Sequence, residues 1–229
     1  MRFDVRKAVL AAALAAPLLL WGAGERAAAA PESPIEVIRL VPAQPSQVAP
    51  SEVSVLVFFD FNQASKTLFE RLALWAKNVG GHVVLDRELV MAPGPAPLAR
   101  AFVVARTLGV TDAVLPALFE LAARQPPRET QQAFSGAEPP IKPAIADIFR
   151  SVGINEIEFN AAWDSKLSDA GLRRARAMAE RFQIHAAPVI VVNGLWKLVP
   201  MAGASANNLV DALNGKMNRV IVQTSAERE

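Results

Sequence analysis

The sequence predicts an α/β protein whose sheet is interrupted by an all-α insertion. Strand-like runs occur in the first 92 residues, residues 93–182 carry helical periodicity, and two further strand-like runs and a helix follow. Apolar residues make up 52% of the 229, which is enough for a well-buried core and argues against disorder.

The chain opens with the features of an export signal. Its basic residues are Arg2, Arg6 and Lys7, followed by an apolar run over residues 8–21 and small residues at 27–30. The apolar run is shorter than the roughly 20 residues that span a bilayer. Pro31 disfavours cleavage directly before it, so residues 1–29 are the expected signal peptide, and an uncleaved anchor is the alternative. We expect no membrane span in the mature chain.

Charge and cysteine content exclude several classes of function. The expected signal peptide accounts for the formal charge of +2, so the remainder is neutral and offers no footprint for nucleic acid. The chain contains no cysteine, so no disulfide supports its core. His82 and His185 are the only histidines, too few for a histidine-rich zinc site, and we expect neither metal nor cofactor.

Two strands are expected before the first helix. Residues 35–41 form a short apolar run followed by several prolines, which is typical of an edge strand. Residues 53–59, Val-Ser-Val-Leu-Val-Phe-Phe, are apolar on both faces, as in a strand buried on both sides.

A helix and a third strand follow. Apolar residues recur at helical spacing over residues 64–77, and Asn62 fits the N-cap of this helix. The pair Gly80-Gly81 ends the helix, and residues 82–91 are the next expected strand.

Five helices are expected in the block that interrupts the sheet, at residues 97–108, 111–124, 141–152, 155–167 and 168–182. Thr111, Asn155 and Ser168 are the expected capping residues, and residues 125–140 form a loop.

A β-hairpin and a final helix close the predicted fold. Asn193-Gly194 separates apolar runs at residues 189–192 and 195–199, and this dipeptide is the strongest short-range hairpin signal. The last amphipathic helix is expected at residues 204–216.

Taken in order, several of these segments resemble the DsbA family, periplasmic oxidases that introduce disulfides into exported proteins. Phe58-Phe-Asp-Phe61 is similar to the strand before the family's active-site helix, and residues 98–110 and 159–163 are similar to parts of its helical domain. Residues 182–194, which contain His-Ala-Ala-Pro, are similar to its cis-proline loop and following hairpin. The resemblance implies a periplasmic location and a thioredoxin-like fold with a helical insertion domain.

The resemblance also divides the chain. The expected parts are a signal peptide at 1–29, an N-terminal segment with the edge strand at 30–52, a thioredoxin-like domain at 53–92 and 183–218, a helical insertion domain at 93–182, and a C-terminal tail at 219–229.

The redox motif of the family is missing. Its Cys-x-x-Cys, at the start of the first helix, matches Gln63, Ala64, Ser65 and Lys66. A helix N-terminus stabilises a thiolate, but Gln63 has no ionisable group. The family's buried acidic residue beneath the motif is replaced by Val57. The resemblance therefore implies a degenerate member with no catalytic residue. Lys66 is expected to be a solvated side chain, and a contact with an acidic partner or with Asp60 is the alternative.

A peptide-binding groove is the remaining expectation at this place. Pro188, preceded by Ala187, matches the family's cis-proline, beside which an extended peptide can add as a strand. His185 and Trp196 are the further candidate groove residues. The alternative is that Pro188 serves the fold alone.

Three functions remain open. The first is a partner-binding, scaffold or chaperone-like role towards an exported polypeptide or periplasmic protein. The second is an enzyme similar to kappa-class glutathione transferases, because Phe59-Asp-Phe61 is similar to their opening motif, although they place a serine where Gln63 stands. The third, by family name only, is a thiol:disulfide interchange protein.

Overall fold

The computed structural model describes residues 33–45, 48–49, 52–79, 82–90, 97–125 and 141–226. The expected signal peptide at 1–29 and residues 126–140 of the expected loop lie outside these ranges.

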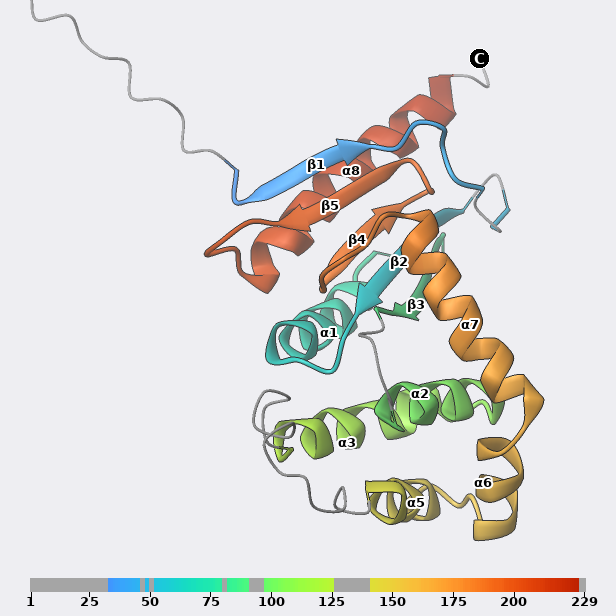
Figure 1. Cartoon of the computed structure of the whole chain (residues 1–229). Coiled ribbons are helices and arrows are strands. Elements are labelled where there is room, and N and C mark those ends of the chain that lie inside the picture. Colours follow the sequence, from blue (N-terminus) through green and yellow to red (C-terminus); the bar gives the residue numbers. More distant parts are fainter. Residues whose placement is uncertain are drawn as a thin grey trace, which may run out of the picture. The chain divides into compact units, whose positions relative to one another are not determined.

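Five strands in the described residues form one sheet with the order β1-β5-β4-β2-β3 (Figure 1). They are β1 Ile35–Arg39, β2 Val53–Phe59, β3 Val83–Leu89, β4 Val189–Val192 and β5 Trp196–Pro200. β2 and β3 are parallel, and the other neighbouring pairs are antiparallel. As predicted, β1 is an edge strand and β2 is an inner strand.

The hairpin between β4 and β5 confirms the prediction made from Asn193-Gly194. Both residues have positive φ, 49° and 62°, which suits the tight turns of two-residue hairpins. The turn also packs against the segment after β1, because the Gln44 N–H donates to the Gly194 carbonyl at 2.8 Å.

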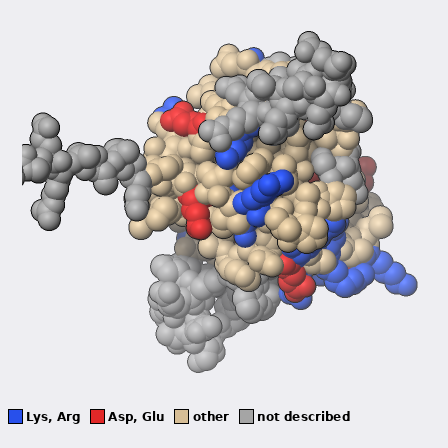
Figure 2. Space-filling view, turned by 90° about the horizontal axis from the view of Figure 1, so that it is seen from above, with Lys and Arg blue, Asp and Glu red and all other residues tan. Residues whose placement is uncertain are grey.

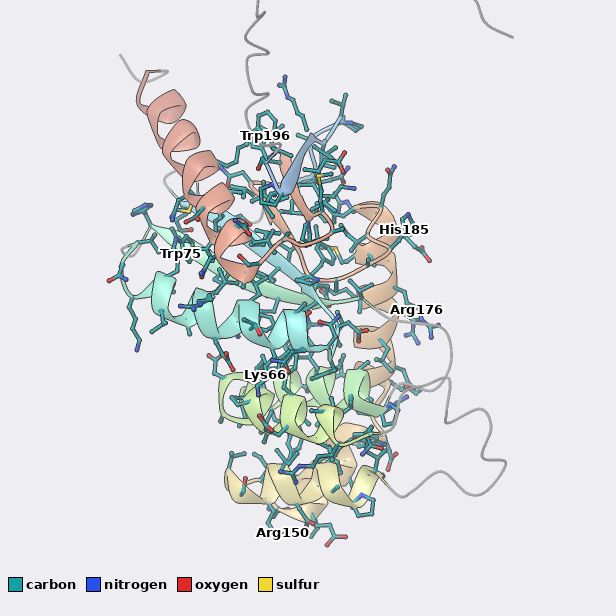
Figure 3. The ribbon with its side chains drawn as sticks, turned by 90° about the vertical axis from the view of Figure 1, so that its left-hand side faces the viewer. Lys66, Trp75, Arg150, Arg176, His185 and Trp196 are labelled. Atoms are coloured by element: carbon teal, nitrogen blue, oxygen red, sulfur yellow. The ribbon has the colours of Figure 1, made fainter. Side chains whose placement is uncertain are left out.

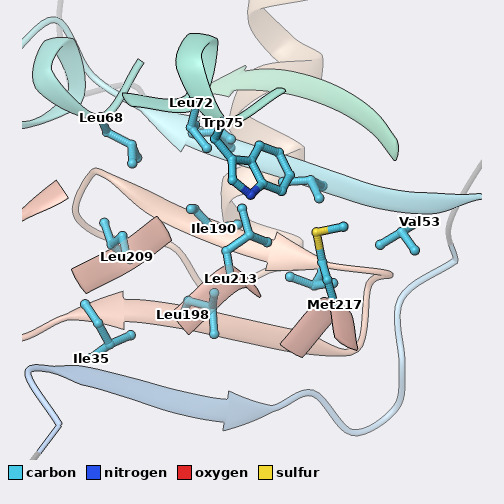
Figure 4. Packing of buried hydrophobic residues seen from close by; sticks show 13 residues of the cluster. Ile35, Val53, Leu68, Leu72, Trp75, Ile190, Leu198, Leu209, Leu213 and Met217 are labelled. Carbon is cyan, nitrogen blue, oxygen red and sulfur yellow. The ribbon is translucent and has the colours of Figure 1, made fainter. Parts of the chain in front are cut away.

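Helices α1, Gln63–Ala76, and α8, Ala206–Ala226, pack against one face of the sheet. Figure 4 shows this core, in which side chains of both helices meet those of the strands. Its members include Val55, Leu68, Leu72, Trp75, Ile190, Leu198, Leu209 and Leu213. α8 continues ten residues beyond its predicted end at residue 216. The β-branched run 220–222 has low helix propensity, which explains why a local pattern places the end too early.

The insertion between β3 and β4 is helical, as predicted. Its described helices are α2 Pro97–Thr107, α3 Thr111–Ala123, α5 Ile141–Ser151, α6 Glu156–Trp163 and α7 Lys166–Arg181. α2, α3, α5 and α6 share a second core. A cluster around Phe59 and Phe102 joins these helices to the end of β2. The end of α7 packs on the sheet face opposite α1 and α8, where Phe182 contacts Phe58.

The helix boundaries correct two expected caps. Asn155 caps α6 with a reciprocal capping box, as predicted. The N-cap of α7, however, is Ser165 rather than Ser168, which is buried and donates its hydroxyl to the Ala162 carbonyl at 2.7 Å. Thr111 is the first residue of α3 and not its cap. Ser165 and Ser168 are both possible N-caps by residue type, and in the structure α7 begins directly after Ser165.

Candidate functional site

The site that matches the redox motif begins where β2 ends and α1 starts. Asn62 is the N-cap, as predicted, because its Oδ1 accepts the Ser65 N–H at 2.8 Å. The Asn62 N–H donates to the Asp60 carbonyl, also at 2.8 Å. These bonds fix the turn and direct the first helical residues.

The four motif positions differ in access. Gln63 and Ala64 are exposed, and Gln63 Nε2 donates to Thr67 Oγ1 at 3.3 Å. Ser65 is fully buried, and its hydroxyl accepts the Asp60 N–H at 3.3 Å. The serine of this helix start is therefore a structural residue with no access to a ligand.

Lys66 forms an ion pair with an acidic side chain, which was the alternative to the solvated side chain that we expected. Its Nζ lies 2.6 Å from Glu120 Oε1 of α3, and Figure 3 shows it between α1 and the helices of the insertion. The hydrogen bond that Lys66 donates to Glu120 raises the pKa of Lys66 and lowers the pKa of Glu120. Lys66, which matches the second cysteine of the family's motif, thus links α1 to the insertion.

The proline loop approaches the helix start from β4. The Ala187–Pro188 peptide bond is cis, and the Ala187 carbonyl accepts a hydrogen bond from Asn62 Nδ2 at 3.3 Å. Residues 62–64 and 186 are exposed, Ala187 is half-buried, and Pro188 is buried. We call residues 62–64 together with 186–187 the helix-start surface.

Trp196 does not belong to this surface, which corrects the expectation made for it. It pairs with Val192 at one end of β4, whereas Pro188 precedes the other end. The hairpin causes this separation, because antiparallel strands place residue 196 beside residue 192. The Trp196 ring instead packs towards α8, with Lys216 Nζ 4.1 Å from its centre.

His185 is exposed and lies two residues before Ala187. Figure 3 shows His185 on the side of the molecule where Arg176 of α7 projects, away from Lys66. Of the four expected groove residues, Ala187 contacts the start of α1 through Asn62 and Pro188 follows it in the chain, and a role of His185 in a groove stays a prediction.

Sequence reasoning missed a buried carboxylate on β3. The Glu88 side chain is 1% exposed and lies 3.3 Å from Arg106 of α2 and 3.5 Å from Arg174 of α7. Burial raises the pKa of Glu88, and the two guanidinium groups offset part of this effect. Side chains alternate along β3, so Glu88 lies on the same face as Asp86, and the sequence pattern alone predicts that it points to solvent. In the structure α7 covers this face and Glu88 is buried.

No group of three or more His, Asp or Glu side chains in the described residues is arranged to hold a metal ion. In the same part of the chain, no helix has the length and apolar content of a bilayer span.

The chain is similar in sequence to known DsbA proteins. It is 31% identical over 110 residues to the thiol:disulfide interchange protein DsbA of Escherichia coli K12, an alignment that covers 48% of each chain. It is 27% identical over 155 residues to the Salmonella typhimurium protein of that name, covering 65% of this chain and 70% of the other. The chain thus spans about half the length of the first of these relatives. No protein-family model matches it.

Solved structures show the same likeness in fold. The DsbA of Pseudomonas aeruginosa superposes with a TM-score of 0.65 at 17% identity, covering 85% of this chain and 95% of that one. The oxidoreductase DsbA from Xylella fastidiosa gives a TM-score of 0.62 at 20% identity, covering 84% and 95%. The predicted resemblance to the DsbA family and the predicted thioredoxin-like fold are both confirmed, and the chain lacks cysteine.

Proposed function

We propose that this chain, which is similar to DsbA proteins in sequence and has their fold, is an exported, periplasmic binding protein without thiol–disulfide chemistry. The expected signal peptide supports export. The proposed partner is an exported polypeptide or another periplasmic protein, held in a scaffold or chaperone-like role.

The single observation that carries the proposal is the chemistry of positions 63 and 66. Thiol–disulfide exchange proceeds by attack of a thiolate on a disulfide sulfur, so it requires sulfur on the protein. The start of α1 presents an amide at Gln63 and an ammonium group at Lys66, and the latter is already bound to Glu120. The two positions that match the family's cysteines thus cannot accept or donate the electron pair.

The proposed binding role uses the helix-start surface. An extended peptide adds to accessible backbone groups, and the helix-start surface offers residue 186, which is exposed, and Ala187, which is half-buried. The Ala187 carbonyl is occupied by the Asn62 amide, but at 3.3 Å this is a long hydrogen bond. A peptide N–H can displace the amide at small cost, so Asn62 competes with the peptide for this carbonyl.

The substitution Asn62→Ser tests this role. A serine keeps the capping oxygen for the Ser65 N–H, so α1 should retain its stability within about 1 kcal/mol. It is too short to reach Ala187, so the carbonyl becomes free. We expect a neutral, extended peptide rich in Val and Thr to bind the variant more tightly than the unaltered chain, measured by fluorescence anisotropy.

The matched control is Asn155→Ser, which makes the same change at the N-cap of α6. It should leave peptide affinity unchanged. Equal affinities for all three chains, or no peptide binding at all, would remove the helix-start surface as a binding site. Retention on immobilised glutathione, with turnover of a glutathione conjugate, would favour the transferase-like alternative instead.

A further inference from the structure

The outward face of α7 carries an unusual concentration of arginine. Its arginines are Arg173, Arg174, Arg176 and Arg181. All four are exposed, and Ala175 and Ala179 on the opposite side of the helix are buried against the sheet and the insertion. Figure 1 shows α7 along the right-hand side of the molecule, and Figure 2, seen from above, shows Lys and Arg gathered at lower right.

Part of this charge is not used within the chain. Arg174 contacts the buried Glu88, and Arg181 donates to Gln44 Oε1. Arg173 and Arg176 form no ion pair or hydrogen bond with any of the described residues. Glu180 is the one acidic side chain of the last two turns of α7, so the positive charge on this face exceeds the negative charge.

We propose that this arginine face of α7 binds an acidic segment of a partner protein. Outside the expected signal peptide the chain is formally neutral, so the arginines are a local feature and not part of a general positive charge. A planar guanidinium pairs with a carboxylate through two parallel hydrogen bonds, and arginine is the side chain best suited to this recognition. This site goes beyond the proposed function, because it does not use the helix-start surface.

The spacing of the arginines fits an extended acidic peptide. Arg173 and Arg181 are eight residues apart in α7, which corresponds to about 12 Å along the helix axis. An extended chain covers this distance in about four residues. Arg173 and Arg176, which are three residues apart and share one face of α7, are closer still, so a segment with two acidic residues can reach both.

The surroundings favour a protein over a membrane. Helices that lie on a bilayer place large apolar side chains beside their basic face. On α7 the exposed large apolar residue is Leu167, in the first turn, at the other end of the helix from the arginines. The arginine face itself offers charge without apolar anchors.

The test compares two double variants that remove the same charge. Arg173→Gln with Arg176→Gln removes the two unpaired arginines, and Arg71→Gln with Arg150→Gln removes two exposed arginines from α1 and α5. Figure 3 shows Arg150 at the far end of the insertion from Arg176. Circular dichroism and thermal unfolding establish that both variants fold.

The probes are a short glutamate-rich peptide, its glutamine counterpart, inorganic phosphate, and vesicles containing anionic lipid. We expect the unaltered chain to bind the glutamate peptide, with affinity that falls as salt is raised, and not the glutamine peptide. The α7 variant should bind roughly tenfold more weakly, and the control variant should bind as the unaltered chain does. Equal weakening in both variants, or absence of binding, overturns the proposal. Binding of vesicles or phosphate without the glutamate peptide also overturns it and assigns the face to a membrane or a free anion.

Discussion

At positions 63 and 66, which match the cysteines of the DsbA motif, the chain carries an amide and an ammonium group. Lys66 is placed in the first turn of α1, where the helix dipole disfavours a cation, yet Glu120 lies 2.6 Å away and balances its charge. Gln63 remains exposed and uncharged. The helix start has thus become a polar surface joined to the insertion by an ion pair.

Lys197 shows how a single side chain supports the proline loop. It is 8% exposed, and its Nζ donates to the carbonyls of Phe182 and Gln183, each at 3.3 Å. These carbonyls stand at the C-terminal end of α7, where a cation is favourable. The segment from Phe182 to Pro188 therefore depends on a group contributed by β5.

Substitution of Lys197 by Met should lower the free energy of unfolding by about 1–3 kcal/mol, because it leaves the buried Phe182 carbonyl and the part-buried Gln183 carbonyl without their donor. Urea denaturation followed by circular dichroism measures this change. Lys77→Met, at an exposed position after α1, is the control and should have little effect. Equal unfolding midpoints for the two variants would show that Lys197 does not support the loop.

Helices α2 and α7 approach each other closely at one glycine. Gly171 of α7 faces Val103 of α2, and a Cβ at position 171 would lie 2.4 Å from Val103 Cγ1. Val103 is buried, so its methyl groups have little room to move. A small residue is needed here although glycine weakens a helix.

Gly171→Ala should therefore destabilise the chain by about 1–3 kcal/mol, in spite of the better helix propensity of alanine. In a Val103→Ala background the clash is absent, so the same change should cost little or stabilise. The difference between the two backgrounds, obtained from chemical denaturation of the four chains, should be about 0.5–3 kcal/mol. Additive effects would mean that the two helices do not meet at these residues.

The elements themselves could be predicted from the sequence, because each depends on local signals. The strand at 53–59, the N-cap Asn62 and the Asn193-Gly194 turn all appear in the structure as expected. The partners of the site could not be predicted in this way. Lys66 meets Glu120, 54 residues away, and Glu88 becomes buried only when α7 covers β3. The misplacement of Trp196 has the same origin, since strand pairing determines which end of the sheet a residue occupies.

At the scale of the whole described chain, Glu88 connects three elements that are far apart in sequence. It lies on β3 and contacts Arg106 of α2 and Arg174 of α7. A buried carboxylate is costly, and here the two guanidinium groups offset part of the cost. The same residue therefore joins the sheet to both helices and makes stability depend on pH.

The direction of this dependence follows from the raised pKa of Glu88. The folded chain binds the proton of the Glu88 carboxyl group more tightly than the unfolded chain does. The stabilisation that comes from this protonation is therefore fully present below the ordinary pKa of a glutamate, and it is lost as pH rises through the raised pKa. The substitution Glu88→Gln removes this pH-dependent contribution to the free energy of unfolding. Measured by chemical denaturation from acidic to neutral pH, the variant should gain stability relative to the unaltered chain as pH rises. A constant difference, or a trend of opposite sign, would contradict the account of Glu88.

The central claim is that the chain has the fold of a disulfide oxidase but not its chemistry. The most direct measurement is the rate of insulin reduction by glutathione, for the unaltered chain and for Gln63→Cys with Lys66→Cys. The unaltered chain should give the rate of buffer alone. The double variant should exceed it, because its thiol at position 63 lies at the N-terminus of α1. Turnover by the unaltered, cysteine-free chain above the rate of buffer would contradict the claim.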